Sequence, residues 1–594
     1  MTRLALLLCL SVCATTAIHA QKRTEVTTSS LCTRDNALDT TKQQILLTRT
    51  YDNAVQRIAV LLRAADLLWP HEQEKSLAAF TEAFDLAVQN FKENGDQVQR
   101  ASSSQFAARI PLPDQRFKVI SALAKRDPAR ARKLSEQILQ DDAREAADKP
   151  ATDDKGKRTL AEKLLATAHT HASTDATTAI NFARQSLRYP AVLALPMFLY
   201  ELSKNNKAAA DQFYVEALNA YSAAPMDQFL YLSSYPFANT REAGEMPGYT
   251  FYALPEGFTP NRALQRQFIQ ALLARVERAM EMTVPETPAY RYSDHAQMWL
   301  AVNRLEKQVQ SELPDLADAI IRSKDKLFAL LTPNVQQNVN RVIGNDNAPK
   351  KSFDEQVEAA EKLTDVGQRD SRLTFAVTGS SKDEPVDKVL SVIDKISESG
   401  VRDSLLNWFY YFRTQNLIKE KNLSEARKVA SRVSVLDQRA YLFTRIAEES
   451  LKVAEDQTQT REMLNEVADA ISKAPKTIVS ARALLALAHL YAKVDTNRGV
   501  EELGNAVRTI NTIESPDFSR QFVMMKIEGK TFGSYAAYQT PGFNPENAFR
   551  EMGKLDFDGS LTQATNFSDK SLRALTTLAV IEPCFTTKGR TGTK

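Results

Sequence analysis

Residues 479–507 read VSARALLALAHLYAKVDTNRGVEELGNAV. Apolar residues recur at spacings of three and four on both sides of a short polar segment, Asp495-Thr496-Asn497. Such spacings place side chains on one face of an α-helix, whereas a short polar segment is typical of a turn. The stretch therefore predicts a helical hairpin that consists of helix A, a turn and helix B.

The apolar face of helix B recurs at a constant period in the C-terminal half. Its first position is occupied, at intervals of 37 residues, by Val389, Ala426, Met463 and Val500. The positions four and seven residues later hold Ile393, Ala430, Val467 and Gly504, then Ile396, Val433, Ala470 and Val507. Helix A repeats with the same period through Leu405, Leu442 and Val479 and through Phe409, Ile446 and Ala483. Repetition at a fixed period indicates a repeat architecture.

The N-terminal half shows the same pattern with irregular spacing. Its predicted helix faces carry Ala131, Ser135 and Ile138, then Ala179, Ala183 and Ser186, then Ala210, Tyr214 and Ala217. A single helix pair cannot bury such a face, whereas stacked pairs bury it against one another. We therefore predict an all-α fold, a helix-hairpin repeat solenoid or α-α superhelix.

Local signals refine the predicted hairpins. Ser424, Thr460 and Thr496 are residue types that favour the N-cap, and each stands near the predicted start of a helix B. Gly504 belongs to a series of mostly small residues. Small residues allow two helices to approach closely, so we expect Gly504 to face helix A of its own hairpin.

The repeats resemble divergent tetratricopeptide-type repeats. Leu487-Ala488-His489-Leu490-Tyr491 is similar to that family's Leu-Gly-x-x-Tyr, and Ala426 stands at its small helix-B position, with Ala470 and Pro475 downstream. The chain departs from the family in its period of 37 residues rather than about 34, in lacking the helix-A tryptophan, and in the large Met463. The resemblance covers 370–515 and implies a helical fold that tends to bind proteins or peptides. It transfers no functional residue.

Length and composition are those of a large globular protein. The chain has 594 residues, which is too many for one compact core and predicts several domains or a repeat array. Lys and Arg total 76 against 73 Asp and Glu, and the two signs are mixed along the chain. Because no basic block is present, the sequence predicts no nucleic-acid partner.

The first twenty residues have the pattern of a secretory signal peptide. Arg3 precedes an apolar run from Leu4 to Val12, and Ala20 offers a cleavage site before Gln21. The alternative is lipid anchoring at Cys13, which the bulky Val12 disfavours. We expect cleavage after Ala20 and a periplasmic or secreted location.

No later apolar run is long enough to span a bilayer, so we expect no transmembrane anchor in the mature chain. The whole chain also resembles exported helical proteins of unassigned function in bacterial genomes.

Two cysteines remain after signal cleavage, Cys32 and Cys584. In an oxidising compartment two cysteines can pair, and a bridge here would close nearly the whole chain into one loop. The alternatives are two unrelated thiols or a link between molecules, because the spatial separation of the two residues is not visible in the sequence.

The helical pattern fails in two segments rich in Gly, Pro and aromatic residues, 225–260 and 516–550. Both contain Gly-Phe-x-Pro: Phe258 and Phe543 are 285 residues apart, as are Pro260 and Pro545. In each case we expect a helix to resume with the proline in its first turn. The match indicates two related halves, each of which ends in an aromatic insert.

The aromatic residues of the inserts are the candidate binding residues: Tyr231, Tyr235, Phe251, Tyr252, Phe532, Tyr535 and Tyr538. Aromatic side chains combine large contact areas with polar tips, which suits a ligand surface. The alternative is a plug that seals the end of each array, and it is favoured because large aromatic residues are usually buried.

No enzyme motif is present. The sequence contains no Gly-x-Gly-x-x-Gly, no P-loop, no Gly-x-Ser-x-Gly and no His-Glu-x-x-His. His169-Thr170-His171 is the strongest metal pattern, but residues two apart on a helix point in different directions. We assign no catalytic residue, no metal ligand and no cofactor.

These patterns divide the chain into segments: 1–20 signal peptide, 31–224 N-terminal array, 225–260 first insert, 261–343 connecting helices, 352–515 C-terminal repeats, 516–550 second insert, and 551–594 C-terminal helix and tail. The leading functional hypothesis is an exported scaffold that binds a protein or peptide partner, by analogy of fold. The second is a structural component of an envelope assembly. An enzyme with a site built from the inserts ranks lowest.

Overall fold

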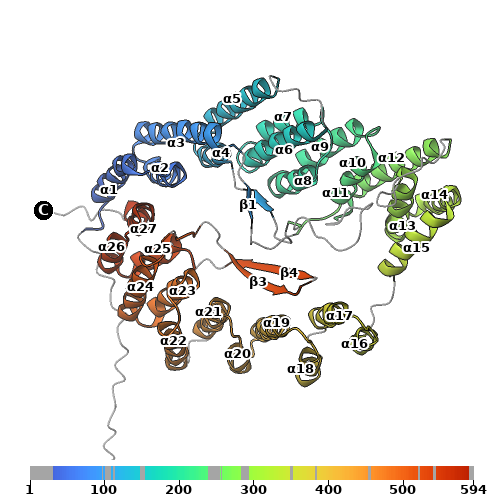
Figure 1. Cartoon of the computed structure of the whole chain (residues 1–594). Coiled ribbons are helices and arrows are strands. Elements are labelled where there is room, and N and C mark those ends of the chain that lie inside the picture. The colour runs from blue at the N-terminus through green and yellow to red at the C-terminus, as the bar shows by residue number, and fades with distance from the viewer. Residues whose placement is uncertain are drawn as a thin grey trace, which may run out of the picture. The chain divides into compact units, whose positions relative to one another are not determined.

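A computed structural model of the chain shows an almost entirely helical protein (Figure 1). The structure describes residues 31–95, 98–100, 109–111, 114–147, 154–238, 254–255, 257–281, 293–347, 352–380, 384–452, 457–514, 516–518, 522–530, 532–539 and 543–586. The predicted signal peptide, 1–20, lies outside these residues, and its cleavage stays a prediction. Within the described ranges, no helix is both long enough and apolar enough to cross a bilayer.

The chain divides into two compact units, which we call the terminal unit and the central unit. The terminal unit joins the chain up to Leu47 to the chain from Asp365 onward, and the central unit runs from Thr48 to Thr364. In chain order, the central unit is therefore an insertion within the terminal unit. Both of its ends continue covalently into the terminal unit.

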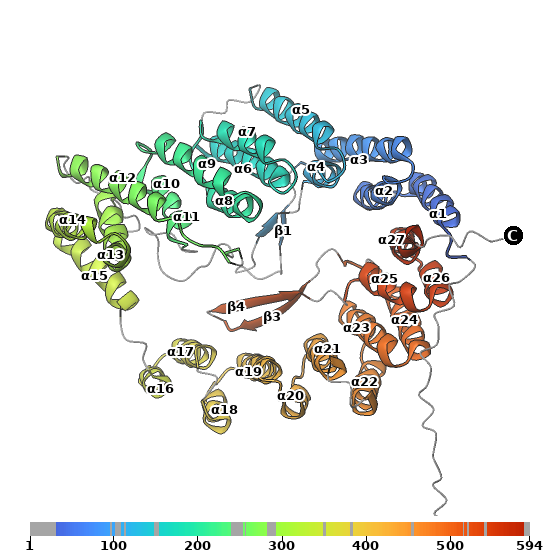
Figure 2. The same cartoon turned by 180° about the vertical axis from the view of Figure 1, so that it is seen from behind.

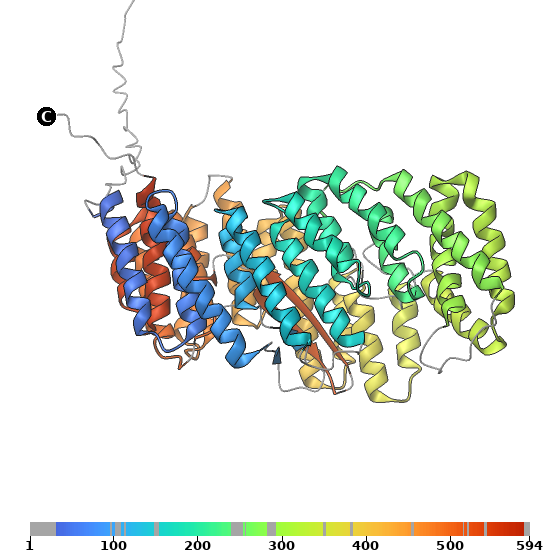
Figure 3. The same cartoon turned by 90° about the horizontal axis from the view of Figure 1, so that it is seen from above.

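The central unit is a stack of helices with one short hairpin of strands. Its elements are η1 (Thr48–Thr50), α2 (Ala54–Leu68), α3 (Gln73–Asn94), β1 (Val98–Arg100), β2 (Arg109–Pro111), α4 (Gln115–Ala124), α5 (Pro128–Ala147), α6 (Asp154–His171), α7 (Ala176–Ser186), α8 (Ala194–Asn205), α9 (Lys207–Ala220), α10 (Met226–Leu230), η2 (Tyr231–Ser233), α11 (Ser234–Phe237), α12 (Arg262–Met280), α13 (Asp294–Glu312), η3 (Pro314–Leu316), α14 (Ala317–Leu330), α15 (Pro333–Asn347) and α16 (Phe353–Glu361). The blue to green helices lie side by side in the view from above (Figure 3).

The helix faces predicted for the central unit are its core. All nine predicted positions on α5, α7 and α9 are buried: Ala131, Ser135, Ile138, Ala179, Ala183, Ser186, Ala210, Tyr214 and Ala217. Side-chain caps set where these helices begin. Asp175 accepts a hydrogen bond from the backbone N–H of Thr178 at the start of α7, and Asn206 does the same for Ala209 at the start of α9. The helices that these caps begin are therefore the same helices that the apolar periodicity predicts.

The terminal unit alternates inner and outer helices. Its elements are α1 (Arg34–Leu47), α17 (Val366–Thr378), α18 (Val386–Asp394), α19 (Ser399–Lys419), α20 (Leu423–Ala430), α21 (Leu436–Lys452), α22 (Gln457–Ser472), α23 (Ile478–Val494), α24 (Thr496–Ile510), β3 (Phe522–Glu528), β4 (Gly533–Gln539), α25 (Pro545–Leu555), α26 (Phe557–Thr565), α27 (Lys570–Ile581) and η5 (Glu582–Phe585). The A helices α17, α19, α21 and α23 lie on the side of the β3–β4 hairpin, and the B helices α18, α20 and α22 lie outside them (Figures 1 and 2).

The 37-residue repeat is confirmed as the seam between the A and B helices. The first B-helix positions, Val389, Ala426 and Met463, are at most 2% exposed, and the residues four positions later are buried as well. Val500 is only half-buried. The chain is therefore an all-α protein of stacked helix-hairpin repeats.

Two local expectations about the repeats are wrong. The N-caps of α20 and α24 are Asn422 and Asp495, which lie before Ser424 and Thr496. Their side chains accept hydrogen bonds from the backbone N–H groups of the third helical residue, so the helices begin earlier. The predicted cap Thr460 likewise lies inside α22, which begins at Gln457.

The close approach of helix A involves Gly499 rather than Gly504. A Cβ atom at Gly499 would lie 2.9 Å from the backbone nitrogen of Ala492 on α23. A Cβ atom at Gly504 would instead meet the side chain of Gln563, which is on α26. Gly499 therefore lets α23 and α24 pack with their backbones in contact, whereas Gly504 leaves room for the Gln563 side chain of α26.

A buried polar side chain on one A helix holds the start of the next A helix. Asp370 on α17 accepts hydrogen bonds of 3.0 Å from the backbone N–H groups of Ser397 and Glu398, just before α19. Asn407 on α19 accepts hydrogen bonds of 2.8 and 3.1 Å from Ser434 and Val435, just before α21. All three positions of this clasp recur after 37 residues, so it is part of the repeat.

The two inserts contain more regular structure than their composition predicts. Residues 226–237 of the first insert form α10, η2 and α11, and residues 522–539 of the second form the antiparallel hairpin β3–β4. Pro545 occupies the first turn of α25 as predicted. Pro260 does not occupy the first turn of α12, because the N-cap of that helix is Asn261. The two Gly-Phe-x-Pro segments therefore meet their helices in different registers.

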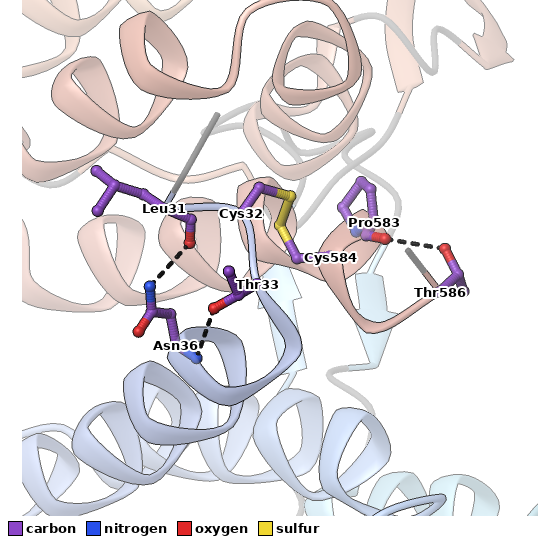
Figure 4. Close-up of a disulfide and its surroundings, with 7 residues drawn as sticks. All are labelled: Leu31, Cys32, Thr33, Asn36, Pro583, Cys584 and Thr586. Carbon is purple, nitrogen blue, oxygen red and sulfur yellow. Dashed lines mark hydrogen bonds between the residues drawn. A yellow bond between two sulfur atoms is a disulfide. The ribbon is translucent and has the colours of Figure 1, made fainter. Parts of the chain in front are cut away.

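Cys32 and Cys584 form an intramolecular disulfide within the terminal unit (Figure 4). Their Cα atoms are 5.2 Å apart although 552 residues separate them in the sequence. The bond joins the residue that precedes α1 by two positions to η5, and α1 contacts both α27 and η5. The first and last described helices of the chain therefore lie together.

The clasp predicts the effect of removing Asn407. Asn407→Ala leaves two backbone N–H groups and the side chain of Gln438 without their partner, which we expect to destabilise the α19–α21 pair by about 1–3 kcal/mol. Hydrogen exchange of peptides from both helices measures this free energy. Asn416→Ala, on the same helix but half-exposed, is the matched control and changes exchange little. Equal effects of the two substitutions would contradict the clasp.

Asp437 predicts a pH dependence of the same unit. It is 6% exposed at the start of α21, and burial raises the pKa of its carboxyl to about 6 while Arg482 partly opposes the shift. Because the folded pKa lies above the unfolded one, the buried charge costs stability as pH rises through about 4–6. The loss is about 2–3 kcal/mol. Hydrogen exchange of α21 at pH 4.5 and pH 7.5 measures it, and Asp437→Asn abolishes the difference. An equal pH dependence in both proteins would show that another group is responsible.

Candidate functional site

Tyr235, a candidate binding residue of the first insert, is part of the core. Its side chain is 1% exposed and its ring lies 5.6 Å from Tyr214 and 5.3 Å from Phe258, measured between ring centroids. Its hydroxyl donates a 2.7 Å hydrogen bond to Asp211 Oδ1. Burial, reinforced by Asp211, holds the pKa of Tyr235 well above its ordinary value, so the hydroxyl stays a donor.

Asp211 on α9 gathers three polar groups around the first insert. Besides Tyr235, it accepts a 2.8 Å hydrogen bond from Asn261 Nδ2 and an ion pair of 3.3 Å from Lys207 Nζ. The Lys207 ammonium also lies 4.9 Å from the ring centroid of Phe258, which is a cation–π distance. This network attaches Tyr235, Phe258 and Asn261 to α9 through Asp211 and Lys207.

The other candidates of the first insert add no open groove among the described residues. Tyr231 is half-buried and packs against the same core as Tyr235. Phe251 and Tyr252 lie outside the described residues. The described aromatic side chains of this insert therefore pack into the core, as the plug hypothesis predicts.

The second insert is a β-hairpin that packs on α19. Met525 and Ile527 of β3 are buried, whereas Lys526 between them is exposed, so one face of the strand is covered. A Cβ atom at Gly529 would lie 3.1 Å from Cγ2 of Val401, so glycine permits this contact with α19. The backbone N–H of Lys530 also donates to Glu398 at 3.4 Å.

The three candidates of the second insert lie on this hairpin. Phe532 follows the turn and is half-buried. Tyr535 and Tyr538 are in β4, where they pair in register with Lys526 and Val523 of β3. The structure describes the backbone of these two tyrosines but not their side chains.

Sequence reasoning missed an aromatic surface on the A helices. Trp408 and Phe412, one helical turn apart on α19, are both half-exposed, with ring centroids 4.6 Å apart. The aromatic contacts continue through Tyr411 to Tyr441 on α21, whose ring is 6.4 Å from that of Phe543 at the end of the second insert. The signal in the sequence is the run of five aromatic residues from Trp408 to Phe412.

Phe375 is an exposed aromatic residue on α17, the A helix of the preceding repeat. It is 62% exposed, more than any other large apolar residue that the structure describes. It precedes Phe412 by 37 residues, so the two occupy the same repeat position on neighbouring A helices. We call Phe375, Trp408, Phe412 and Tyr441 the aromatic row.

A buried serine–histidine pair in the described part of the chain, Ser135 and His171, does not have the geometry of a nucleophile and its base. Ser135 Oγ donates its only proton to the carbonyl of Ala131 at 2.9 Å, so His171 Nε2, 3.1 Å from the same oxygen, must be the donor. Both residues are fully buried, and the His171 ring stacks on Phe182. Burial lowers the pKa of His171, which keeps it neutral. This pair is structural.

Other chemistry-bearing groups are dispersed in the described ranges. No three His, Cys, Asp or Glu side chains there converge as metal ligands. A groove of about 480 Å³ lies along α3, lined by Arg57, Ala78, Thr81, Glu82, Asp85, Leu86 and Gln89. Within it, Arg57 and Glu82 are paired with each other. Among the described residues, the aromatic row is therefore the strongest candidate for binding.

We compared the chain with protein families, curated proteins and solved structures. No family model and no curated protein matches the chain. Among solved structures, a "Circular tandem repeat protein with novel repeat topology and enhanced subunit contact surfaces" shares 11% identity, with 91% of this chain and 96% of that chain covered. The TM-score is 0.12, too low to carry an argument about arrangement or assembly.

The Asp211 network predicts a local effect on stability. Asp211→Ala removes the acceptor of Tyr235 and Asn261, and we expect the α9–α12 region to lose about 1–3 kcal/mol. Hydrogen exchange of α9, α11 and α12 measures the loss. Glu216→Ala is the matched control on the same helix, because its ion pair with Arg184 lies at the surface and is worth about 0–1 kcal/mol. A loss no larger than that of the control would refute the network's role.

Proposed function

We propose that the protein is an exported scaffold that binds a protein or peptide partner through the aromatic row. The observation that carries the proposal is Phe375, which is 62% exposed, together with the half-exposed Trp408 on the next A helix of the repeat array. Export is supported by the signal pattern that ends at Ala20 and by the disulfide, which persists in oxidising compartments.

The chemistry of the row suits a polypeptide. Aromatic side chains supply large apolar contact areas with few rotamers to immobilise, and they dominate the binding energy of protein interfaces. Exposed aromatics keep apolar surface in water, and burying them against a partner is favourable. The repeat sets Phe375 and Phe412 at equivalent positions on α17 and α19, so the row extends from helix to helix. An extended row of this kind contacts several successive side chains of a partner.

Site-specific photo-cross-linking in the producing cells tests the proposal. A photoreactive phenylalanine analogue at position 375 or 412 should cross-link to the same partner, and the recovered protein should begin at Gln21. The same analogue at Val366 or Leu555, exposed apolar positions outside the row, is the matched control. Cross-linking that is equally strong at the control positions would contradict a binding role for the row.

Once the partner is isolated, the row predicts how its affinity changes. Phe375→Ala combined with Trp408→Ala should weaken binding at least about tenfold, because each truncation removes an aromatic contact. Val366→Ala combined with Leu555→Ala should leave the dissociation constant within about twofold. Phe375→Ala alone separates binding from folding, because a side chain that is 62% exposed contributes little to the core.

A further inference from the structure

Helix α1 buries unusually little apolar surface. Of its 14 residues, the buried ones are Ala37 and Thr41, two small side chains. In comparison, α2 buries eight of its 15 residues, and α27 buries nine of its 12. The hydrophobic contribution that docks a helix scales with the apolar area removed from water. Apolar burial alone therefore holds α1 much more weakly than it holds its neighbours.

Several polar contacts of α1 are internal to the helix. Thr41 Oγ1 donates a 2.7 Å hydrogen bond to the carbonyl of Ala37, and Lys42 pairs with Asp39 at 2.7 Å. These interactions support the helix itself. They add nothing to its attachment to α27 and η5.

One link between α1 and its neighbours is covalent. Cys32 stands two residues before α1, and its disulfide partner Cys584 is in η5, directly after α27 (Figure 4). A bond at this position keeps α1 near α27 at a high effective concentration, so that even a small contact area stays docked. The two sulfur-bearing residues differ in access: Cys584 is 1% exposed, whereas Cys32 is only half-buried.

We propose that the Cys32–Cys584 bond is a redox latch that keeps α1 docked on α27 and η5, and that α1 undocks when the bond is reduced. The latch goes beyond partner binding and does not depend on it. Its consequence follows from the chain order. With the bond intact, both ends of the central unit continue into docked helices of the terminal unit, α1 and α17. After reduction, only the junction at Thr364–Asp365 leads into a docked helix.

The release step is a thiol–disulfide exchange with a dithiol. The thiolate of the dithiol attacks Sγ of Cys32, the less buried of the two residues, and the electron pair of the S–S bond leaves with Cys584, which then takes up a proton. The second thiol of the reductant attacks the mixed disulfide and releases Cys32 as a thiol. The protein gains two thiols, and the dithiol is oxidised to its own disulfide.

Hydrogen exchange of the full mature chain before and after reduction with dithiothreitol tests the latch. We expect exchange in α1 to accelerate at least about tenfold on reduction, while α2 and α27 stay protected because they bury more of their residues. Reoxidation should restore the protection of α1. Cys32→Ser should reproduce the reduced state, and it avoids any substitution at the buried Cys584.

Thiol labelling provides an independent readout. After reduction, an undocked α1 should leave Cys584 and Cys32 reacting with a maleimide at rates within about tenfold of each other. Two outcomes overturn the latch. One is an α1 that keeps its protection after reduction, with Cys584 labelled far more slowly than Cys32. The other is simultaneous loss of protection in α1, α25 and α27, which would mean that the bond supports the whole end of the terminal unit.

Discussion

The terminal unit depends on one constraint, which is that no helix pair can bury its apolar face without a neighbour. The seam formed by Val389, Ala426 and Met463 is buried because each B helix packs against A helices, and each pair presents the same face after 37 residues. Repetition meets this requirement, because each helix pair packs against the next pair instead of around one central core. Where the repeat ends, other elements must cover the last pair, and α25 and α26 do so for α23 and α24.

The polar clasp explains why the period is constant where it is. Asp370 and Asn407 hold the residues before α19 and α21, and these two helices begin 37 residues apart. At the next equivalent position stands Thr444, whose hydroxyl donates to Ala440 in its own helix. Helix α23 then begins 42 residues after α21. A single side chain that accepts two backbone N–H groups thus holds the start of α19 and of α21, whereas α23, where Thr444 stands at the equivalent position, begins five residues later than a 37-residue step would place it.

The candidate site shows why aromatic composition alone is ambiguous. Tyr235 and Phe532 both belong to aromatic inserts, yet Tyr235 is enclosed in a satisfied network and Phe532 follows the turn of a hairpin that packs on α19. Burial depends on which helix each insert meets: Tyr235 meets Asp211 of α9, 24 residues away, whereas the second hairpin meets Glu398 beside α19, 132 residues away. The aromatic row lies instead within the repeats. The 37-residue spacing of Phe375 and Phe412 can be read from the sequence, but whether these side chains face solvent or a neighbouring helix cannot. Trp408 and Phe412 lie one helical turn apart on α19, and both keep part of their surface exposed.

The sequence by itself determined the helices, their 37-residue period and the residues of the seam, because these follow from local spacing and from the need to bury one face. It left open the division into two units and the pairing of Cys32 with Cys584, since both depend on contacts between segments more than 300 residues apart. It also misplaced the N-caps by one or two residues, because Asn422 and Asp495 compete with nearby Ser and Thr for the same role. Only the tertiary structure decided which aromatic residues are core and which stay exposed, because that outcome requires the partner surface to be in place.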